Sequence, residues 1–393
     1  MPGPAARAVN MDAKLQERYS RQILFAEIGA SGQQRLRASS AVLIGCGALG
    51  TALANLLVRA GLGKLRIVDR DFVEPSNLQR QTLFEEADAR EALPKAVASE
   101  RRLTAINSDV TVEGVVADLT PSNARELLGG FPLLLDGTDN FETRLLMNDY
   151  AVSHNIPWIY AAVVASYGVT MTVRPGDTAC LACLAESDGN PNDSNPTDDS
   201  QAGDHAARNS EMPGDTATPQ AGRMATPQES AVPGAEPTCD TAGVLGAAAG
   251  IIACMESTAA IKLLLGKFNA RDARLVSYDV WTGFFQSIRV ARRSDCRACV
   301  RREFRYLTGE AQPHVTMCGR DSVQIHEQRR RLDLASLGKA LASAGHDVRH
   351  NEFLLRVCMP RYELTVFSDG RAIVKGTKDP AVARSLYARY VGA

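Results

Sequence analysis

The sequence predicts an α/β protein with a doubly wound, mostly parallel sheet, followed by a small α+β module. Apolar strands alternate with helical patterns between residues 41 and 180, which is typical of a parallel sheet covered on both faces. A G-x-G-x-x-G sequence, formed by Gly45, Gly47 and Gly50, follows the first strand and precedes a helical pattern. Rossmann-like folds begin in this way, so we expect a nucleotide at this turn.

Composition limits the class of protein. The chain has 393 residues, a formal net charge of -1 and 45% hydrophobic residues, so nothing global indicates nucleic acid or a membrane as a partner. Residues 1–10 contain no apolar signal segment, which favours the cytoplasm. The apolar stretch Ala242–Met255 is too short to span a bilayer and predicts a buried core helix.

The predicted elements follow one another in a regular order. Apolar runs predict strands at 41–44, 64–69, 110–118 and 132–136, and a pair of strands within 157–173. Helical patterns lie between them at 50–60, 87–106, 123–128 and 143–154. After Cys239 we expect a long helix to about Leu265 and two further strands at 274–280 and 283–291.

Two changes in pattern predict the domain organisation. Residues 187–238 contain no Phe, Tyr, Trp, Ile or Leu and cannot bury enough surface to offset their chain entropy. We interpret them as a disordered insert within a first domain, 1–310. From about Pro313 the order strand, helix, three strands and helix predicts a separate α+β module, 311–393.

The glycine turn alone leaves the cofactor open. Glycines let the backbone approach a phosphate, and the following helix adds N–H donors and a partial positive charge. Asp69 ends the second strand, where a carboxylate can accept hydrogen bonds from ribose hydroxyls. Both features suit NAD and ATP equally, and close packing alone is a third explanation of the glycines.

Polar residues further along favour a polyphosphate. Asp71, Asn77, Arg80, Gln81 and Lys95 gather beyond the second strand, a density of charge that suits triphosphate better than a nicotinamide ring. A later strand is followed by Asp136, Asp139, Asn140 and Arg144, where a carboxylate can hold Mg²⁺ against phosphate oxygens. Alternatively, Asp139 or Asn140 caps the helix that follows.

The nine cysteines indicate a metal or catalysis rather than disulfides. Two C-x-x-C pairs, Cys180 with Cys183 and Cys296 with Cys299, match a closed four-thiolate site for structural Zn²⁺. Redox pairs or plain buried cysteines are the alternatives. We expect the basic run 289–305 to be a solvated face. Three further cysteines are predicted to be core residues: Cys46, Cys254 and Cys358.

Several separated motifs resemble the ThiF/MoeB (HesA/MoeB/ThiF) adenylyltransferases, relatives of the ubiquitin-activating enzymes. They are RYSRQI, GCGALG, DRDFVEPSNLQRQ, LPK, DGTDNFETR and the paired C-x-x-C, in that order over residues 15–305. The resemblance implies binding of ATP, Mg²⁺ and Zn²⁺, and a homodimer. It implies adenylation of the C-terminal glycine of a ubiquitin-like sulfur carrier protein ending in Gly-Gly, with release of pyrophosphate.

The resemblance also implies roles for individual residues. Asp69 would hold the ribose, Arg80 and Lys95 the phosphates, and Asp139 the Mg²⁺, while Arg21 would reach the triphosphate of a partner subunit. The full nucleotide-binding set is Gly45, Gly47, Ala48, Gly50, Asp69, Asp71, Ser76, Asn77, Leu78, Gln79, Arg80, Gln81, Lys95, Asp139 and Asn140. Two features depart from the family: Ala48 stands where relatives often have glycine, and the insert is unusually long.

Cys239 matches the cysteine of the family's crossover loop. It lies between the insert and the expected helix, where a helix N-terminus would favour its thiolate. An acyl adenylate is a good electrophile, so Cys239 could capture the carrier as a thioester or join it through sulfur in an acyl disulfide. A spectator near the helix cap is the alternative.

Two other functions remain as hypotheses: an NAD(P)-dependent oxidoreductase and a non-catalytic nucleotide-binding scaffold. Of the six histidines, only His154 lies in the expected folded nucleotide region, which counts against a dehydrogenase or a Ser-His-Asp hydrolase. The pathway stays open between thiamine biosynthesis, molybdopterin biosynthesis and related thiolations. A cysteine desulfurase or a rhodanese would supply the sulfur.

Overall fold

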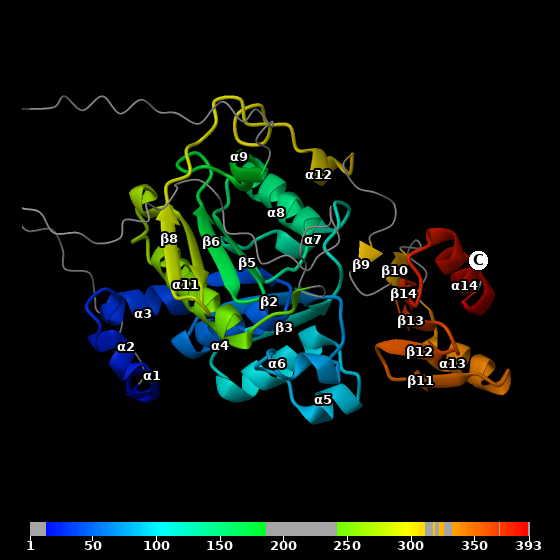
Figure 1. Ribbon diagram of the computed structural model, residues 1–393. Helices are drawn as coiled ribbons and strands as arrows, with labels where there is room; N and C mark the ends of the chain where they lie inside the picture. The colour runs from blue at the N-terminus through cyan, green and yellow to red at the C-terminus, as the bar shows by residue number, and fades with distance from the viewer. Residues whose placement is uncertain are drawn as a thin grey trace, which may run out of the picture. The chain divides into compact units, whose positions relative to one another are not determined.

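A computed structural model of the chain describes residues 13–185, 242–310, 317–318, 322–325, 332–368 and 370–391 (Figure 1). The predicted insert 187–238 and Cys239 lie outside the described residues. The described strands form two sheets, one of eight strands and one of six.

The eight-stranded sheet has the order β3-β2-β1-β4-β5-β6-β7-β8. Pairing is parallel from β3 to β5 and antiparallel from β5 to β8, and β5 and β6 form a hairpin. The doubly wound, mostly parallel sheet is therefore confirmed, including the paired strands. The strands are β1 (Ser40–Ile44), β2 (Lys64–Asp69), β3 (Thr111–Val116), β4 (Leu134–Asp136), β5 (Trp158–Val164), β6 (Tyr167–Val173), β7 (Leu275–Asp279) and β8 (Phe284–Ile288).

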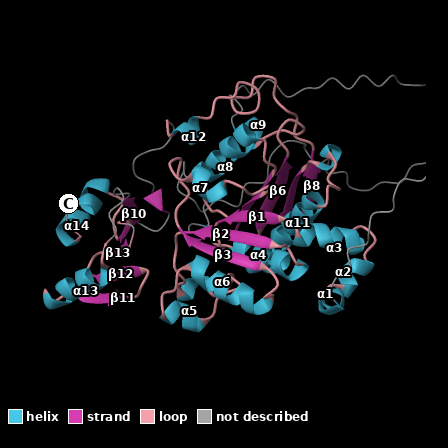
Figure 2. Ribbon diagram, turned by 180° about the vertical axis from the view of Figure 1, so that it is seen from behind, coloured by secondary structure: helices cyan, strands magenta, loops and turns pink. Residues whose placement is uncertain are grey.

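Helices cover both faces of this sheet (Figure 2). One face packs under α3 (Gly29–Arg37), α4 (Ala48–Ala60), α6 (Lys95–Ile106) and α11 (Gly246–Leu264). The other face packs under α7 (Ala124–Leu128), α8 (Phe141–His154) and α9 (Leu181–Ala185). The remaining short helices of this part are α1 (Ala13–Arg18), α2 (Ser20–Leu24), η1 (Pro75–Asn77), α5 (Glu86–Arg90), η2 (Ala270–Asp272) and α12 (Arg305–Thr308).

The structure corrects some details of these helices. The predicted helix 87–106 is two helices, α5 and α6, since Pro94 stands at the N-cap of α6 and cannot continue a preceding helix. The predicted helix after Cys239 is described as α11 only from Gly246. By length and composition α11 could cross a membrane, yet it packs against α4, β5 and β6 as a core helix. Cys254 on α11 is exposed, so its assignment to the core is wrong.

The six-stranded sheet is antiparallel, in the order β11-β12-β13-β14-β10-β9. It contains two strands that were not predicted. One is the two-residue strand β9 and the other is β11, which precedes β12. Helices α13 (Leu334–Ser343) and α14 (Pro380–Tyr390) pack on it and share its core. The strands are β9 (Met317–Cys318), β10 (Ser322–Ile325), β11 (Asp347–His350), β12 (Leu354–Cys358), β13 (Glu363–Phe367) and β14 (Ala372–Lys375).

The parallel register brings three strand ends into one row. Ile44 of β1 pairs with Val68 of β2 and with Asp136 of β4. The next residues are joined by backbone hydrogen bonds of 2.8 Å, from Gly45 N to Val68 O and from Gly137 N to Ile44 O. The chain moves from β1 to β2 on one side and later to β4 on the other. This is a topological switch point, where ligands bind in α/β sheets.

We predict that the glycines of the turn differ in their effect on folding. An alanine Cβ at Gly45 would lie 2.5 Å from Gly137 O, at a backbone φ of +86°, and a Cβ at Gly50 would collide with Gly45 O. Gly45→Ala and Gly50→Ala should each lower the free energy of unfolding by about 2 kcal/mol or more. Urea denaturation measures this.

Gly47→Ala is the matched control for folding. A Cβ at Gly47 would meet only Gln81 Nε2, at 3.9 Å, and φ there is -84°. This variant should unfold at nearly the wild-type urea concentration. Equal destabilisation by all three variants would contradict the packing account.

Candidate nucleotide and metal sites

The first part of the candidate site is the turn between β1 and α4. Gly47 is the N-cap of α4, and the N–H groups of the first helical turn have no partner within the helix. The space beside Gly47 is open, in contrast to Gly45 and Gly50, which pack against backbone. The turn can therefore bring an anion close to the helix N-terminus. Ala48 is the first residue of α4, where a methyl group is accommodated.

Asp69 ties the glycine turn to the end of β2. Its Oδ2 accepts a hydrogen bond of 2.6 Å from Cys46 N, and its Oδ1 accepts one of 2.7 Å from Asp71 N. Burial raises the pKa of the Asp69 carboxyl to about 6, against the lowering effect of Lys95. Cys46 is buried as predicted, and burial with the charge of Asp69 raises the pKa of its thiol to about 12.

Lys95 supplies a fixed positive charge at the same edge. It is the first residue of α6 and only 6% exposed, and its Nζ lies 3.0 Å from Asp71 Oδ2. Burial alone would lower the pKa of Lys95, but the charges of Asp71 and Asp69 outweigh it and raise that pKa. Lys95 is therefore an ammonium ion at neutral pH.

The segment 75–81 holds buried polar atoms that have no partner in the part of the chain that the structure describes. Asn77 Nδ2 and Gln81 Oε1 are buried and have no hydrogen-bond partner among the described residues. Such groups are costly unless a ligand or water satisfies them. Arg80 is half-buried, and its Nη1 donates to Ser76 O at 2.8 Å. Ser76, Leu78 and Gln79 belong to the same turn.

Asp139 and Asn140 have different roles in the loop after β4. Asn140 caps α8, since its Oδ1 accepts a hydrogen bond of 2.8 Å from Thr143 N. The predicted cap therefore falls to Asn140. Asp139 is exposed, and its charge raises the pKa of both Lys95 and Arg144. Asp139 is thus free of the capping role and electrostatically coupled to the Lys95 side of the site.

A buried network supports this loop. Arg144 Nε donates to Asp136 Oδ2 at 3.0 Å, and Asp136 Oδ1 accepts from the N and Oγ1 of Thr138. Glu256 of α11 reaches the same point, where its Oε1 accepts a hydrogen bond of 3.2 Å from Asp136 N. Glu256 Oε2 is buried without a partner among the described residues. Burial, followed by the charge of Asp136, raises the pKa of Glu256 well above its ordinary value.

Arg21 does not join this cluster within one chain. It is exposed on α2, and the neighbouring Tyr19 packs against Gly61 at the C-terminal end of α4. The glycine turn lies at the opposite end of that helix of 13 residues, about 20 Å away.

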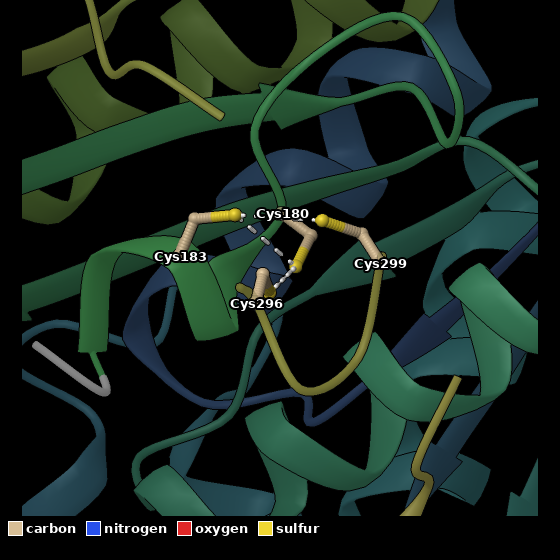
Figure 3. A group of neighbouring side chains, drawn as sticks. All are labelled: Cys180, Cys183, Cys296 and Cys299. Atoms are coloured by element: carbon tan, nitrogen blue, oxygen red, sulfur yellow. Dashed lines mark hydrogen bonds between the residues drawn. The ribbon is translucent and has the colours of Figure 1, made fainter. Parts of the chain in front are cut away.

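The four predicted cysteine ligands come together, although the two pairs are far apart in the sequence (Figure 3). Their Sγ atoms all lie within 4.8 Å of one another and all four are buried. Four thiols at such distances suit tetrahedral coordination of Zn²⁺ by thiolates, so this donor set fits the predicted metal. One pair comes from α9 and the preceding turn, the other from the loop 296–299.

The basic run around the second cysteine pair is only partly a solvated face. Arg297 is buried, and its Nη1 and Nη2 each lie 3.1 Å from a carboxylate oxygen of Asp149 on α8. Arg292 Nη2 donates to Cys299 O at 2.7 Å. Arg297 thus holds the cysteine loop against α8, and Arg292 braces the same loop from within the run, which the composition of the run does not reveal.

Sequence reasoning missed Glu256 as a residue of the site. The signal was a single acidic residue inside an apolar helix, in the stretch IIACMESTAAI. It also left Asp136 and Arg144 without roles, although it placed them at the strand end. The structure shows that they form the support under the Asp139 loop.

Comparison with known proteins shows the family of the chain. The model of the ThiF family matches residues 19–298. The chain belongs to the ThiF family.

Three named relatives are similar to this chain over most of its length. It is 40% identical over 379 residues to the sulfur carrier protein ThiS adenylyltransferase of Bacillus subtilis, covering 95% of this chain and 99% of the relative. It is 33% identical to the SAMP-activating enzyme E1 of Haloferax volcanii, covering 74% of this chain and 91% of that relative. It is 32% identical to the adenylyltransferase and sulfurtransferase MOCS3 of Sus scrofa, over 81% and 59%.

Solved structures confirm the fold of the ThiF part. The crystal structure of Escherichia coli MccB with ATP superposes with a TM-score of 0.54 and 20% identity, covering 74% of this chain and 76% of that one. The Bacillus relative extends further, because 95% of this chain aligns with it, so the similarity reaches beyond the predicted limit at residue 305.

We predict that the cysteine cluster binds one Zn²⁺ per chain. Cys183→Ser or Cys299→Ser should remove the metal and lower the melting temperature, because a closed site loses one of four ligands. Cys358→Ser, on the other sheet, is the control and should keep its zinc. Elemental analysis of the purified protein decides this. Stoichiometric zinc in the Cys183→Ser, Cys299→Ser double variant would refute the site.

We predict that Glu256→Gln stabilises the protein more as pH rises. The raised pKa of Glu256 means that the folded state favours the neutral acid, so stability is full below the ordinary pKa of 4.5 and declines above it. A neutral glutamine can still accept from Asp136 N. The gain over wild type should grow by up to about 1.4 kcal/mol per pH unit.

Melting temperatures across about pH 5 to 8 measure this difference. Glu126→Gln removes an exposed acid on α7 and is the control, with no comparable pH trend expected. A pH-independent difference between Glu256→Gln and wild type would contradict the buried neutral acid.

Proposed function

We propose that this ThiF-family chain is an ATP-dependent adenylyltransferase that activates the C-terminal glycine of a ubiquitin-like sulfur carrier protein as an acyl adenylate. The observation that carries the proposal is the meeting of an open glycine turn, a charged Lys95 and the exposed Asp139 at one sheet edge. The unpartnered Asn77 and Gln81 atoms at this edge support a polar ligand. An NAD(P)-dependent oxidoreductase and a non-catalytic nucleotide-binding scaffold are the rival functions.

The reaction needs charge stabilisation and no general base. The attacking group is a C-terminal carboxylate, which is already ionised at neutral pH because its pKa is about 3.5. One of its oxygens bonds to the α-phosphorus of ATP while the bond to pyrophosphate breaks. Lys95 and Arg80 offset the negative charge that grows on the phosphates, and the N-terminus of α4 adds N–H donors. Asp69 orients the ribose.

Asp139 would hold Mg²⁺, together with phosphate oxygens. Its exposed carboxylate, not used as a helix cap, suits a hard cation that keeps several waters. The ion would supply further positive charge near the leaving pyrophosphate. Asn140 lies beside it and fixes the start of α8.

The carrier is of the ThiS type, and the product serves sulfur transfer in thiamine biosynthesis. The support is the relative named ThiS adenylyltransferase, which matches this chain over 99% of its own length, whereas MOCS3 matches over 59%. A molybdopterin-type carrier is the alternative. A cysteine desulfurase or rhodanese would supply the sulfur, and the reaction would take place in the cytoplasm.

A homodimer would complete the site. Arg21 is exposed and far from the glycine turn of its own chain, which suits a role at the triphosphate of a partner subunit. Large apolar side chains are also exposed, notably Trp281 at 81% and Leu24 at 73%. Exposed apolar surface of this kind marks contact with another protein. We also keep 1–310 as the catalytic domain and 311–393 as a separate module, because each has a sheet and a hydrophobic core of its own.

We predict that the protein, given ATP, Mg²⁺ and a ThiS-type carrier ending in Gly-Gly, catalyses carrier-dependent exchange of pyrophosphate into ATP. Arg80→Ala or Asp139→Ala should lower the rate by roughly 100-fold, because each removes a preorganised charge contact worth about 3 kcal/mol. Glu142→Gln, at a half-buried position in the first turn of α8, is the control and should exchange normally. Unchanged exchange in Asp139→Ala would disprove the metal role.

Cys239 would capture the activated carrier. Its thiolate would attack the acyl carbonyl, form a thioester and release AMP, after losing its proton to solvent. We predict that Cys239→Ala keeps pyrophosphate exchange and loses a hydroxylamine-sensitive carrier adduct on denaturing gels. Cys254→Ala, at an exposed cysteine of α11, is the matched control. Equal adduct in Cys239→Ala and wild type would make Cys239 a spectator.

A further inference from the structure

The six-stranded sheet has two apolar faces, and only one of them is covered by its own helices. Alternate residues of β12, β13 and β14 point to opposite faces. Leu355, Val366 and Val374 belong to the core shared with α13 and α14. Their neighbours in the strands belong to a second, separate cluster, which consists of Leu354, Phe367 and Ile373 together with Phe72.

Phe72 is the member of this second cluster that comes from outside the module. It lies in the segment after β2 and is only 6% exposed. The guanidinium of Arg356 lies 4.3 Å from the centroid of its ring, and Lys375 Nζ lies 5.6 Å from it. The ring is thus held by apolar contacts and by two cations of the module.

Polar contacts hold the same segment on both sides of Phe72. Lys375 Nζ forms an ion pair of 2.6 Å with Glu74 Oε1. Arg70 Nη1 donates to Gln324 Oε1 at 2.7 Å. These bonds join the module to the residues two positions before and two positions after Phe72, so both ends of the segment 70–74 are held.

The module also forms hydrogen bonds with the turn before Lys95. Asn351 Nδ2 donates to Glu91 O at 3.1 Å and to Ala92 O at 3.2 Å. Ala92 has a φ of +47°, a left-handed conformation that a non-glycine residue adopts at a cost. The contact from Asn351 helps to offset that cost.

The two segments that the module contacts carry or adjoin charged residues of the candidate site. Asp71 lies within 70–74, and Lys95 follows the turn at 91–92. Phe72 forms an isolated antiparallel bridge with Pro94. Two backbone hydrogen bonds of 2.8 Å flank it, from Val73 N to Leu93 O and from Lys95 N to Asp71 O. Movement of Phe72 would therefore move the 3.0 Å ion pair between Asp71 and Lys95.

We propose that Phe72 is a positioning residue through which the C-terminal module holds Asp71 and Lys95 in the geometry that binds the nucleotide. The module then acts on the affinity for ATP without contacting ATP. The kinetic part of this proposal rests on the proposed adenylation, while the positioning of the segment does not.

The test uses substitutions on both sides of the contact in the full-length protein. Leu354→Asn alters the module at a residue outside its own core, and Phe72→Ser removes the ring from the other side. Leu354→Met is the conservative variant, and it should keep the apolar contact with Phe72. Lys339→Glu, at an exposed position on α13, is the control.

We expect Leu354→Asn and Phe72→Ser to raise the KM for ATP in pyrophosphate exchange by about tenfold, with kcat changed by less than about twofold. This follows if the competent arrangement falls to about a tenth of the population. Hydrogen–deuterium exchange should become faster in peptides covering 70–77 and 91–96. Leu354→Met and Lys339→Glu should behave as wild type in both measurements.

Hydrogen–deuterium exchange separates this proposal from the proposed function. If the hydrogen–deuterium exchange rates of peptides 70–77 and 91–96 are unchanged in both Leu354→Asn and Phe72→Ser, the positioning role is overturned, whatever the enzymatic activity. Absence of pyrophosphate exchange in wild type would refute adenylation, and the deuterium result would still decide the positioning. Peptides from α14 show whether the module stays folded, and Phe72→Ser leaves its core untouched.

Discussion

The hydrogen bond of 2.8 Å from Gly137 N to Ile44 O joins the ends of strands β1 and β4, where the backbone leaves the sheet after each strand. A side chain at Gly45 would collide with Gly137 O, and one at Gly50 would collide with Gly45 O. At Gly47, by contrast, the space beside the backbone is open, so a ligand can reach the N-terminus of α4 there. Packing at two glycines thus leaves the third available for binding.

Charge at this edge follows from the same constraint. Asp69 is buried by the turn and uses both oxygens to bind backbone N–H groups of Cys46 and Asp71, which fixes where Asp71 lies. Asp71 in turn keeps Lys95 charged although the lysine is almost fully buried. On the other side, Arg144 and Asp136 hold the loop of Asp139, and Glu256 closes this network from α11. Among the described residues, the candidate site is therefore a set of fixed charges without a histidine.

Much of the fold could be predicted from the sequence, because its signals are local. The strand, glycine turn and helix around Gly45 are contiguous, and the C-x-x-C spacing limits each cysteine pair to a tight turn. The buried Glu256, the exposed Cys254 and the buried Arg297 were not predicted from α11 or the basic run alone. Their environment depends on which helix face meets the sheet and on partners such as Asp149, far away in the sequence. The contact of Phe72 with β12–β14 is of the same kind, since only the strand alternation hints at a second apolar face.

The most direct test of the account is the intact mass of a ThiS-type carrier after incubation with this protein, ATP and Mg²⁺. The account predicts a carrier heavier by one adenylyl group, formed together with pyrophosphate and absent when Lys95→Ala replaces the wild type. A carrier of unchanged mass, in a sample that binds a nicotinamide dinucleotide in preference to ATP, would contradict it.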